Sequence, residues 1–289
     1  MSFRSLSSKI IPLVSKIEIE RKFLPTLPLL QALTPGSHPS PSLPFRTHPA
    51  PEVFIRDVYY DTPDGRLSTR GLWVRRRDSI AAGAAIYSTS NLPMSCWEAK
   101  VRVGGDFIAS QFVEVEGPEA VERELKRVLC EPHVPVDELE ERLGVMCDLT
   151  ARRLSARVEL LADAESARDL RDRNLTLAID QVVETTGGDF EAAQDVLESP
   201  SKHRSADSFF HEIGELEIMA EARTDATEDV TERQDQEHEA VRKAVGATCA
   251  AELEAFMHAH PSLFPMTPKP RGKLVAYFAW KESRGSTVC

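Results

Sequence analysis

The stretch Ile17-Glu18-Ile19-Glu20-Arg21-Lys22-Phe23 decides the fold, because apolar and charged residues alternate along it. In a β-strand, side chains at positions i and i+2 point to the same face. The two isoleucines therefore share one face, while Glu18, Glu20 and Lys22 share the other. The pattern predicts a strand with one apolar side and one side that carries two acids and a base.

Similar rows of ionisable residues recur along the chain. One such row, taken alone, is more often the solvated face of an antiparallel strand than a functional surface. Five or more rows in one chain favour a different interpretation, in which the rows line the inside of a closed barrel. The further rows are Trp73, Arg75 and Arg77; Glu98, Lys100 and Arg102; Glu114 and Glu116; Arg153, Ser155, Arg157 and Glu159; and Glu215 and Glu217.

The rest of the chain shows short strands interleaved with helices and no βαβ regularity. This arrangement predicts an α+β protein built on an antiparallel sheet or a closed barrel. After Pro270 and Gly272, the apolar spacing predicts a C-terminal helix that covers the barrel and carries Lys273 in its first turn. Strands are expected at 17–23, 53–60, 71–77, 97–103, 107–116, 154–161, 175–185 and 209–219, and helices at 118–129, 136–143 and 228–260, the last with a candidate break at Gly246.

These elements predict a single domain over residues 17–281. Residues 1–16 are expected to form a disordered lead-in, and residues 282–289 a disordered tail. Three segments with loop-like composition, rich in Pro, Ser or other small and polar residues, are expected to be insertions. They lie at 33–51, 79–95 and 187–207.

The composition limits the classes of function. The chain has 289 residues and a formal net charge of −11, which argues against nucleic-acid binding through a broad basic surface. Its five cysteines are scattered without a CxxC pair or a zinc spacing, as in proteins of the reducing cytoplasm. No stretch has the length and composition of a membrane-spanning helix. We therefore expect a soluble, cytoplasmic protein, and a monomer because nothing demands a partner chain.

The charged rows point to one kind of ligand. The common catalytic signatures are missing, including the P-loop, the GxSxG elbow, HExxH and the Rossmann GxGxxG. A triphosphate carries several negative charges, which Arg and Lys neutralise, whereas Mg²⁺ takes oxygen ligands from Glu and Asp. Acids and bases in one cavity therefore indicate a metal–triphosphate complex and phosphoryl transfer.

Several of these segments form an ordered set of motifs. They are an ExExK strand at 17–25, the segment 56–63, a W-x-R-x-R strand at 72–77, a W-E-x-K element at 97–100, Glu114, Arg153, and the segments 177–180, 214–217 and 273–277. The set resembles the CYTH superfamily of triphosphate tunnel enzymes, and within it the thiamine triphosphatases. The resemblance implies a closed antiparallel eight-stranded barrel with helices packed outside. The three insertions depart from the family pattern and bear on substrate choice more than on triphosphate binding.

The resemblance also implies roles for individual residues. The expected reaction is the hydrolysis of thiamine triphosphate, with Mg²⁺ as cofactor, to thiamine diphosphate and phosphate. Arg153 is preferred over its neighbour Arg152, because this choice aligns Arg157 and Val158 with the following strand of the family pattern. The expected substrate-binding residues are Lys22, Trp73, Arg75, Arg77, Lys100, Arg153 and Lys273. The expected metal-binding residues are Glu18, Glu20, Asp180, Glu215 and Glu217, with Glu114 in support, and the expected catalytic set is Glu18, Glu20, Lys22, Arg75, Arg77 and Lys100.

The expected identity of the substrate depends on the role of Trp73, whose side chain lies on the same strand face as Arg75 and Arg77. Its indole could stack on the cationic thiazolium of thiamine, a contact worth about 0.5–2 kcal/mol, or it could fill the barrel end as a core residue. Trp97 has the opposite parity to Lys100 and is expected outside the lumen. The alternatives are an inorganic tripolyphosphatase of the same superfamily, a nucleotide cyclase or mRNA-capping triphosphatase, and a non-catalytic polyphosphate-binding module.

Overall fold

The computed structural model describes most of the chain. The described residues are 10–34, 43–82, 94–106, 108–130, 138–161, 170, 173–199, 205, 207–227 and 232–285.

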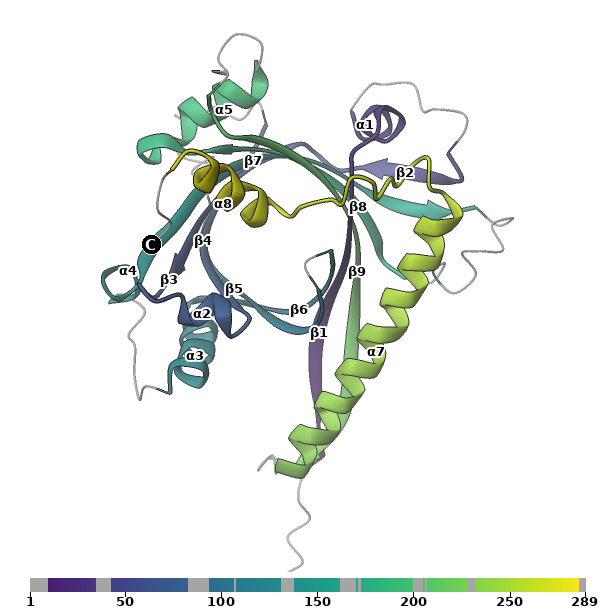
Figure 1. Cartoon of the computed structure of the whole chain (residues 1–289). Helices are drawn as coiled ribbons and strands as arrows, with labels where there is room; N and C mark the ends of the chain where they lie inside the picture. The colour runs from purple at the N-terminus through teal and green to yellow at the C-terminus, as the bar shows by residue number, and fades with distance from the viewer. Residues whose placement is uncertain are drawn as a thin grey trace, which may run out of the picture.

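Eight antiparallel strands close into a barrel (Figure 1), as the sequence predicts. Their order is β7-β3-β4-β5-β6-β1-β9-β8, and β8 pairs with β7 to complete the ring. A ninth strand, β2, pairs with β7 beyond the end of β3. The strands are β1 (Ile10–Phe23), β2 (Phe45–Pro49), β3 (Val53–Asp61), β4 (Leu72–Ala81), β5 (Met94–Gly105), β6 (Ala109–Glu116), β7 (Gly144–Leu160), β8 (Leu175–Glu184) and β9 (Phe210–Thr227).

The helices lie outside the barrel. The longest, α7, runs along β1 and β9, while α3 packs on β4 and β5, α5 covers β7 and β8, and α8 lies across the barrel opening (Figure 1). In the part of the chain that is described, no helix is both long and apolar enough to cross a membrane. The helices are α1 (Leu27–Leu33), α2 (Arg66–Thr69), α3 (Pro118–Leu129), α4 (Leu139–Arg142), the 3-10 turn η3 (Thr186–Gly188), α5 (Phe190–Glu198), α7 (Glu232–Ala259) and α8 (Lys273–Ser283).

The hydrophobic core lies between the barrel wall and these helices. Ile17 and Ile19 of β1 are fully buried in a cluster that includes Leu253 and Phe256 of α7. On another side, the apolar stripe of α3 packs against the outward residues of β3, β4 and β5. Each buried aliphatic side chain of this kind stabilises the fold by about 1.5–3 kcal/mol. Because the apolar residues of each strand face outward, their alternate neighbours face the lumen.

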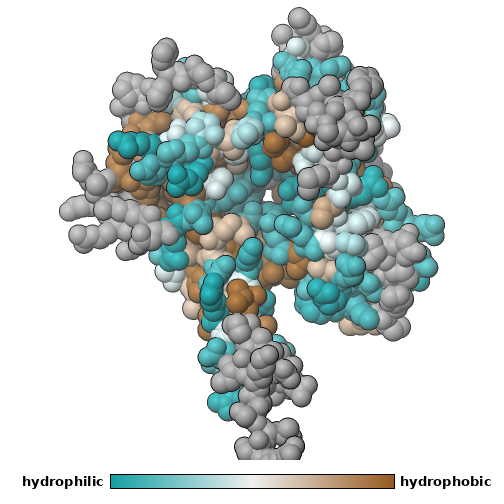
Figure 2. Space-filling view, turned by 180° about the vertical axis from the view of Figure 1, so that it is seen from behind, coloured by the Kyte–Doolittle hydropathy of each residue, from teal (hydrophilic) through white to brown (hydrophobic). Residues whose placement is uncertain are grey.

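Viewed from behind, hydrophilic residues gather around the middle of the molecule, with hydrophobic residues scattered between them (Figure 2).

The first strand is longer than predicted. Residues 10–16 belong to β1, because they pair with residues 221–227 of β9 in one continuous ladder. The disordered lead-in expected at 1–16 is therefore wrong for residues 10–16, and residues 1–9 lie outside the described part. At the other end, α8 extends through Ser283 into the expected tail, whose residues 286–289 lie outside the described part.

The predicted insertions contain regular structure. The segment 33–51 holds β2, and the segment 187–207 holds α5, whose first turn is capped because the Asp189 carboxylate accepts a hydrogen bond from the Ala192 amide at 2.9 Å. Within 79–95, β4 continues to Ala81 and β5 begins at Met94, and residues 83–93 lie outside the described part. The helix expected at 136–143 is described only as α4, and residues 131–137 lie outside the described part.

The candidate break at Gly246 is absent, since α7 is continuous through this residue. Gly246 meets the barrel where Gln111 points outward, and a Cβ at this position would lie 2.4 Å from the Gln111 Oε1. The glycine therefore permits a close helix–strand contact and does not end the helix.

Gly214 allows a similarly close approach inside the main core. It pairs with Phe23 across β1 and β9, and an added Cβ would lie 2.2 Å from the Phe23 ring. Phe23 is fully buried and packs edge-to-face on Phe264 with ring centroids 5.0 Å apart.

We predict that Gly214→Ala lowers the free energy of unfolding by about 2 kcal/mol, because the phenyl ring has no room to move away. Gly144→Ala is the matched control, since its nearest contact would be an ordinary 3.9 Å. Urea unfolding followed by circular dichroism measures both variants. Equal stability of the two would contradict the packing argument.

Candidate active site

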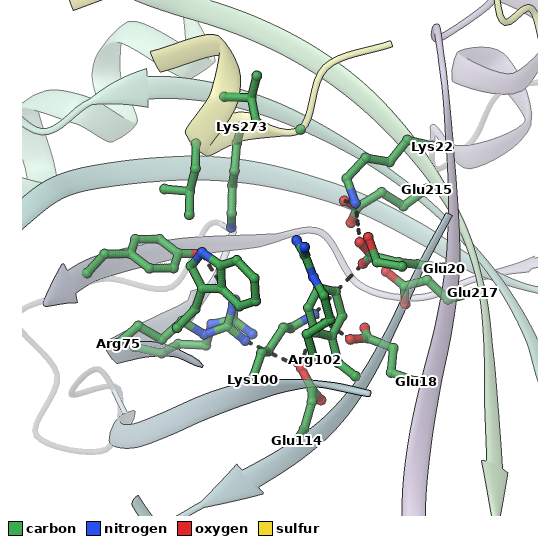
Figure 3. Close-up of a pocket in the computed structure, with 18 of the residues that line it drawn as sticks. Glu18, Glu20, Lys22, Arg75, Lys100, Arg102, Glu114, Glu215, Glu217 and Lys273 are labelled. Carbon is green, nitrogen blue, oxygen red and sulfur yellow. Dashed lines mark hydrogen bonds and ion pairs between the residues drawn. The ribbon is translucent and has the colours of Figure 1, made fainter. Parts of the chain in front are cut away.

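The charged rows of six strands meet in one cavity inside the barrel. The cavity has a volume of about 290 Å³, and Figure 3 shows acidic and basic side chains converging on it from the strands and from α8. Its basic lining residues are Lys22, Arg75, Arg77, Lys100, Arg102, Arg153 and Lys273, and its acidic ones are Glu18, Glu20, Glu114, Glu215 and Glu217.

Three carboxylates form a compact group on one wall. Glu18 and Glu20 of β1 and Glu217 of β9 each offer an oxygen atom, and these atoms lie within 4.8 Å of one another. The group follows from strand register, because Glu20 pairs directly with Glu217. Burial, and then the Glu18 carboxylate, raise the pKa of Glu217 well above its ordinary value. Burial likewise raises the pKa of Glu18, although Lys100 opposes the shift.

This carboxylate group fits a divalent metal ion. Several buried carboxylates in one place repel each other, and a cation between them offsets that repulsion. Their hard oxygen atoms are the ligands that Mg²⁺ takes in proteins. Glu18, Glu20 and Glu217 are thus the residues of this chain that could hold the ion.

Two of the clustered carboxylates have lysine partners, Glu20 with Lys22 and Glu18 with Lys100. The other three predicted metal ligands are also paired with bases. Glu215 lies 3.4 Å from the Lys22 Nζ and 3.3 Å from Arg153, and these neighbours lower its pKa although burial opposes them. Glu114 lies 3.1 Å from the Lys100 Nζ. Asp180 is buried behind Arg153 and accepts two hydrogen bonds of 2.7 Å from its guanidinium.

The preference for Arg153 over Arg152 agrees with the structure. Arg153 lines the cavity, whereas Arg152 points out of the barrel and donates two hydrogen bonds to Glu52.

On the wall opposite the three clustered carboxylates, Asp57 of β3 contacts three basic side chains. Asp57 is not among the site residues predicted from the sequence. Its carboxylate accepts hydrogen bonds of 2.7 and 2.9 Å from Arg77 and of 2.6 Å from Lys273, and Arg75 lies 3.7 Å away. The side chain is almost completely buried. Burial alone would raise its pKa, but the three bases outweigh burial and hold the pKa of the carboxyl well below its usual value.

Two further residues near this wall were missed as site residues. Glu98 accepts a hydrogen bond from the Arg75 Nε at 2.8 Å and lies 3.5 Å from Arg77, and Tyr59 lines the cavity beside Arg75. Strand alternation could have identified Asp57 and Tyr59, because they are polar residues at positions i and i+2 of a predicted strand. Glu98 belongs to a row that the sequence had already singled out.

The first turn of α8 delivers Lys273, as predicted. Gly272 precedes the helix and lies against Lys22, since a Cβ there would be 3.0 Å from the Lys22 Cε. Lys273 then points from α8 into the cavity (Figure 3). The carboxylates of Asp57 and Asp180 help to raise its pKa above the ordinary value, although burial opposes them.

An apolar part of the lining accompanies the charges. It consists of Tyr59, Trp73, Phe112, Met219, Leu274 and Val275. Trp73 faces the cavity, as its parity with Arg75 predicts, and meets Phe112 edge-to-face with ring centroids 5.6 Å apart. Trp97 lies outside the lumen in the cluster under α3, as predicted.

The prediction that the charged rows face the cavity is wrong for the outer ends of two rows. Glu116, Arg157 and Glu159 are exposed because their strands run beyond the cavity, and Glu159 pairs with His48 of β2. All the predicted substrate-binding residues line the cavity. Of the predicted metal-binding residues, only Asp180 does not line it.

The chain belongs to the CYTH domain family, whose model matches residues 16–244. Members of the family are typically metal-dependent triphosphatases or cyclases, and their tunnel domains bind small-molecule triphosphates. A search of the curated proteins gave no match.

Solved structures with a related fold are distant. A Pyrococcus horikoshii protein is 13% identical, with 79% of this chain and 88% of that chain covered and a TM-score of 0.35. A Hippeastrum protein, described as a putative adenylyl cyclase with a dominant triphosphatase activity, is 15% identical over 84% and 87% of the two chains, with a TM-score of 0.36. A putative adenylate cyclase from Bacillus halodurans is 16% identical over 71% and 82%, with a TM-score of 0.31. Similarity at this level does not bear on the activity of the chain.

We predict that Asp57→Asn lowers the free energy of unfolding at neutral pH by about 3–5 kcal/mol, because it leaves buried bases uncompensated. The folded pKa of Asp57 lies below its unfolded value of about 3.9, so its contribution is complete above that pH and is lost as pH falls through the folded pKa. Urea unfolding at neutral and acidic pH measures the difference from the wild type, which should shrink in acid.

The control is Asp207→Asn, which removes the partner of Arg284 in an exposed ion pair. Its expected cost is about 1 kcal/mol or less. A cost for Asp57→Asn no greater than that of the control would contradict the role of Asp57.

Proposed function

We propose that the chain is a metal-dependent triphosphate hydrolase and that it acts on thiamine triphosphate. One observation carries the reaction class, namely three clustered carboxylates that face lysine and arginine side chains within a single cavity. A triphosphate with a divalent ion requires both kinds of group side by side. Membership of the CYTH family supports the same class.

The acidic and the basic residues of the cavity have different roles in the proposed reaction. Glu18, Glu20 and Glu217 would hold Mg²⁺, which when bound would neutralise charge on the phosphate oxygens. Binding of substrate replaces the carboxylate partners of the bases with phosphate oxygens. The basic residues that bind these oxygens are Lys22, Arg75, Arg77, Lys100, Arg153 and Lys273.

In the reaction, water attacks the terminal phosphorus and the bond from that phosphorus to the bridging oxygen breaks. The bases hold the triphosphate in position and stabilise the negative charge that develops on the leaving diphosphate oxygen. The products are orthophosphate and the diphosphate ester.

The apolar lining supports an organic leaving group. Trp73, Phe112 and Met219 lie on one side of the cavity, while Leu274 and Val275 approach from α8. A thiazolium ring could stack on the Trp73 indole through a cation–π contact. An inorganic tripolyphosphatase is the second candidate, and one observation favours it, because the Arg102 guanidinium lies over the same indole at 4.7 Å from its ring centroid.

We expect Mg²⁺-dependent release of phosphate from thiamine triphosphate, with tripolyphosphate and ATP as comparison substrates. Glu217→Gln should lower kcat/KM by about 100-fold or more and raise the Mg²⁺ concentration needed for half-maximal activity, because it removes a negative ligand. Glu221→Gln, in an exposed position of the same strand, is the control and should retain activity. Absence of Mg²⁺-dependent release from all three substrates would refute the proposed activity and leave a binding module.

Trp73→Ala should raise KM for thiamine triphosphate by about threefold to tenfold, because the stacking contact is lost. The effect on tripolyphosphate, which has no ring to stack, should be clearly smaller. Steady-state kinetics with both substrates measures the difference. An equal loss on both would show that the indole does not bind thiamine.

A further inference from the structure

Arg102 is a basic residue of the cavity that contacts an aromatic ring, as Lys100 and Lys273 also do. The Arg102 guanidinium lies over the indole of Trp73, with 4.7 Å between its central carbon and the ring centroid. This distance is within the range of a cation–π contact.

Local backbone structure builds this position. The pairing of β5 with β6 shifts register between Arg102 and Gly104, which is a β-bulge directly after Arg102. Bulges re-aim side chains and are common beside functional sites. The Arg102 amide also donates a hydrogen bond of 2.8 Å to the carbonyl of Gly71, whose φ of +77° suits glycine. Trp73 of β4 pairs with Lys100 of β5, two residues before Arg102, so Arg102 and Trp73 lie near each other on adjacent strands of the cavity wall.

The indole is fixed as well. Phe112, which pairs with Arg102 across β5 and β6, meets the Trp73 ring edge-to-face at an interplanar angle of 84°. A ring held in this way offers a face for stacking, and Arg102 covers one face of it. A ligand group that stacks on that face must displace the guanidinium.

We propose that Arg102 determines leaving-group selectivity in this cavity by competing with a cationic ring for the face of Trp73. The proposal rests on the triphosphatase function proposed above and names a residue that controls which triphosphate is preferred. A thiazolium loses the stacking face and meets a second positive charge, so Arg102 disfavours it. The terminal phosphate of tripolyphosphate carries negative charge, so the same guanidinium favours it.

The test compares two substitutions at one position. Arg102→Gln removes the charge and keeps a polar side chain, whereas Arg102→Lys keeps the charge. We expect Arg102→Gln to raise the ratio of kcat/KM for thiamine triphosphate over tripolyphosphate by about tenfold, the size of a cation–π contact together with a nearby like charge. Arg102→Lys should stay closer to the wild-type ratio.

Two controls separate selectivity from a general effect of charge or fold. Arg76→Gln removes one positive charge from the outer face of β4, where Arg76 pairs with Glu140, and should leave the ratio unchanged. In a Trp73→Ala background, Arg102→Gln should change the ratio clearly less, because the contested face is gone and only the effect of the charge remains. A merely structural role of Arg102 would not depend on the indole.

A binding measurement makes the result independent of turnover. Isothermal titration calorimetry in EDTA gives the dissociation constants of both triphosphates for each variant, and their ratio should move as the kinetic ratio does. A ratio that is unchanged in Arg102→Gln, or that moves toward tripolyphosphate, overturns the role of Arg102. Binding of both ligands without hydrolysis of either in Mg²⁺ refutes the proposed reaction but still tests Arg102, and failure to bind either, in Mg²⁺ as well as in EDTA, overturns both proposals.

Discussion

Charges buried inside the barrel must be compensated by charges of opposite sign, and the rest of the structure depends on this constraint. A buried ion without a partner costs several kcal/mol, so a lumen of lysines and arginines alone would not fold. Asp57 shows how the constraint is met, since one carboxylate holds Arg77 and Lys273 and lies close to Arg75. These three bases come from β4 and α8, so the same ion pairs also fasten the C-terminal helix across the barrel opening.

The two walls of the cavity differ in how their buried charges are arranged. On the Asp57 wall, bases surround the carboxylate, and its low pKa shows that the pairing more than offsets its burial. On the wall formed by β1 and β9, Glu18, Glu20 and Glu217 lie together, and burial raises the pKa of Glu18 and Glu217. One wall thus holds three bases around Asp57, and the other holds three clustered carboxylates, two of which also pair with Lys22 and Lys100. A metal–triphosphate complex would complement this combination of bases and clustered acids.

In the proposed function, substrate choice depends on fewer residues than triphosphate binding. The charged residues would bind phosphate oxygens, which all triphosphates share, and so would not distinguish a thiamine ester from an inorganic chain. The apolar lining and the Trp73–Arg102 contact lie where the rest of the substrate would be. Arg102 lies beyond the W-E-x-K element at 97–100, and a bulge in β5 directly follows it.

The sequence by itself determined the strands and most of the cavity lining, because strand geometry sends residues i and i+2 to the same face. The closed eight-stranded barrel followed from the resemblance of its motifs to the CYTH superfamily. Glu18, Glu20, Lys22, Arg75, Arg77 and Lys100 could be placed together from parity and motif order, and Lys273 from the helical spacing after Gly272. Only the tertiary structure decided which charges pair with which, since closure of the barrel sets the partners. Asp180 and Glu215 thus contact Arg153, Asp57 becomes the partner of three bases, and Arg102 covers the indole. The sequence also did not predict the regular structure in the expected insertions, because β2 pairs with a distant strand and α5 packs on the barrel wall. Local pattern specifies which way a side chain faces, but its partners are brought from distant parts of the chain by the fold.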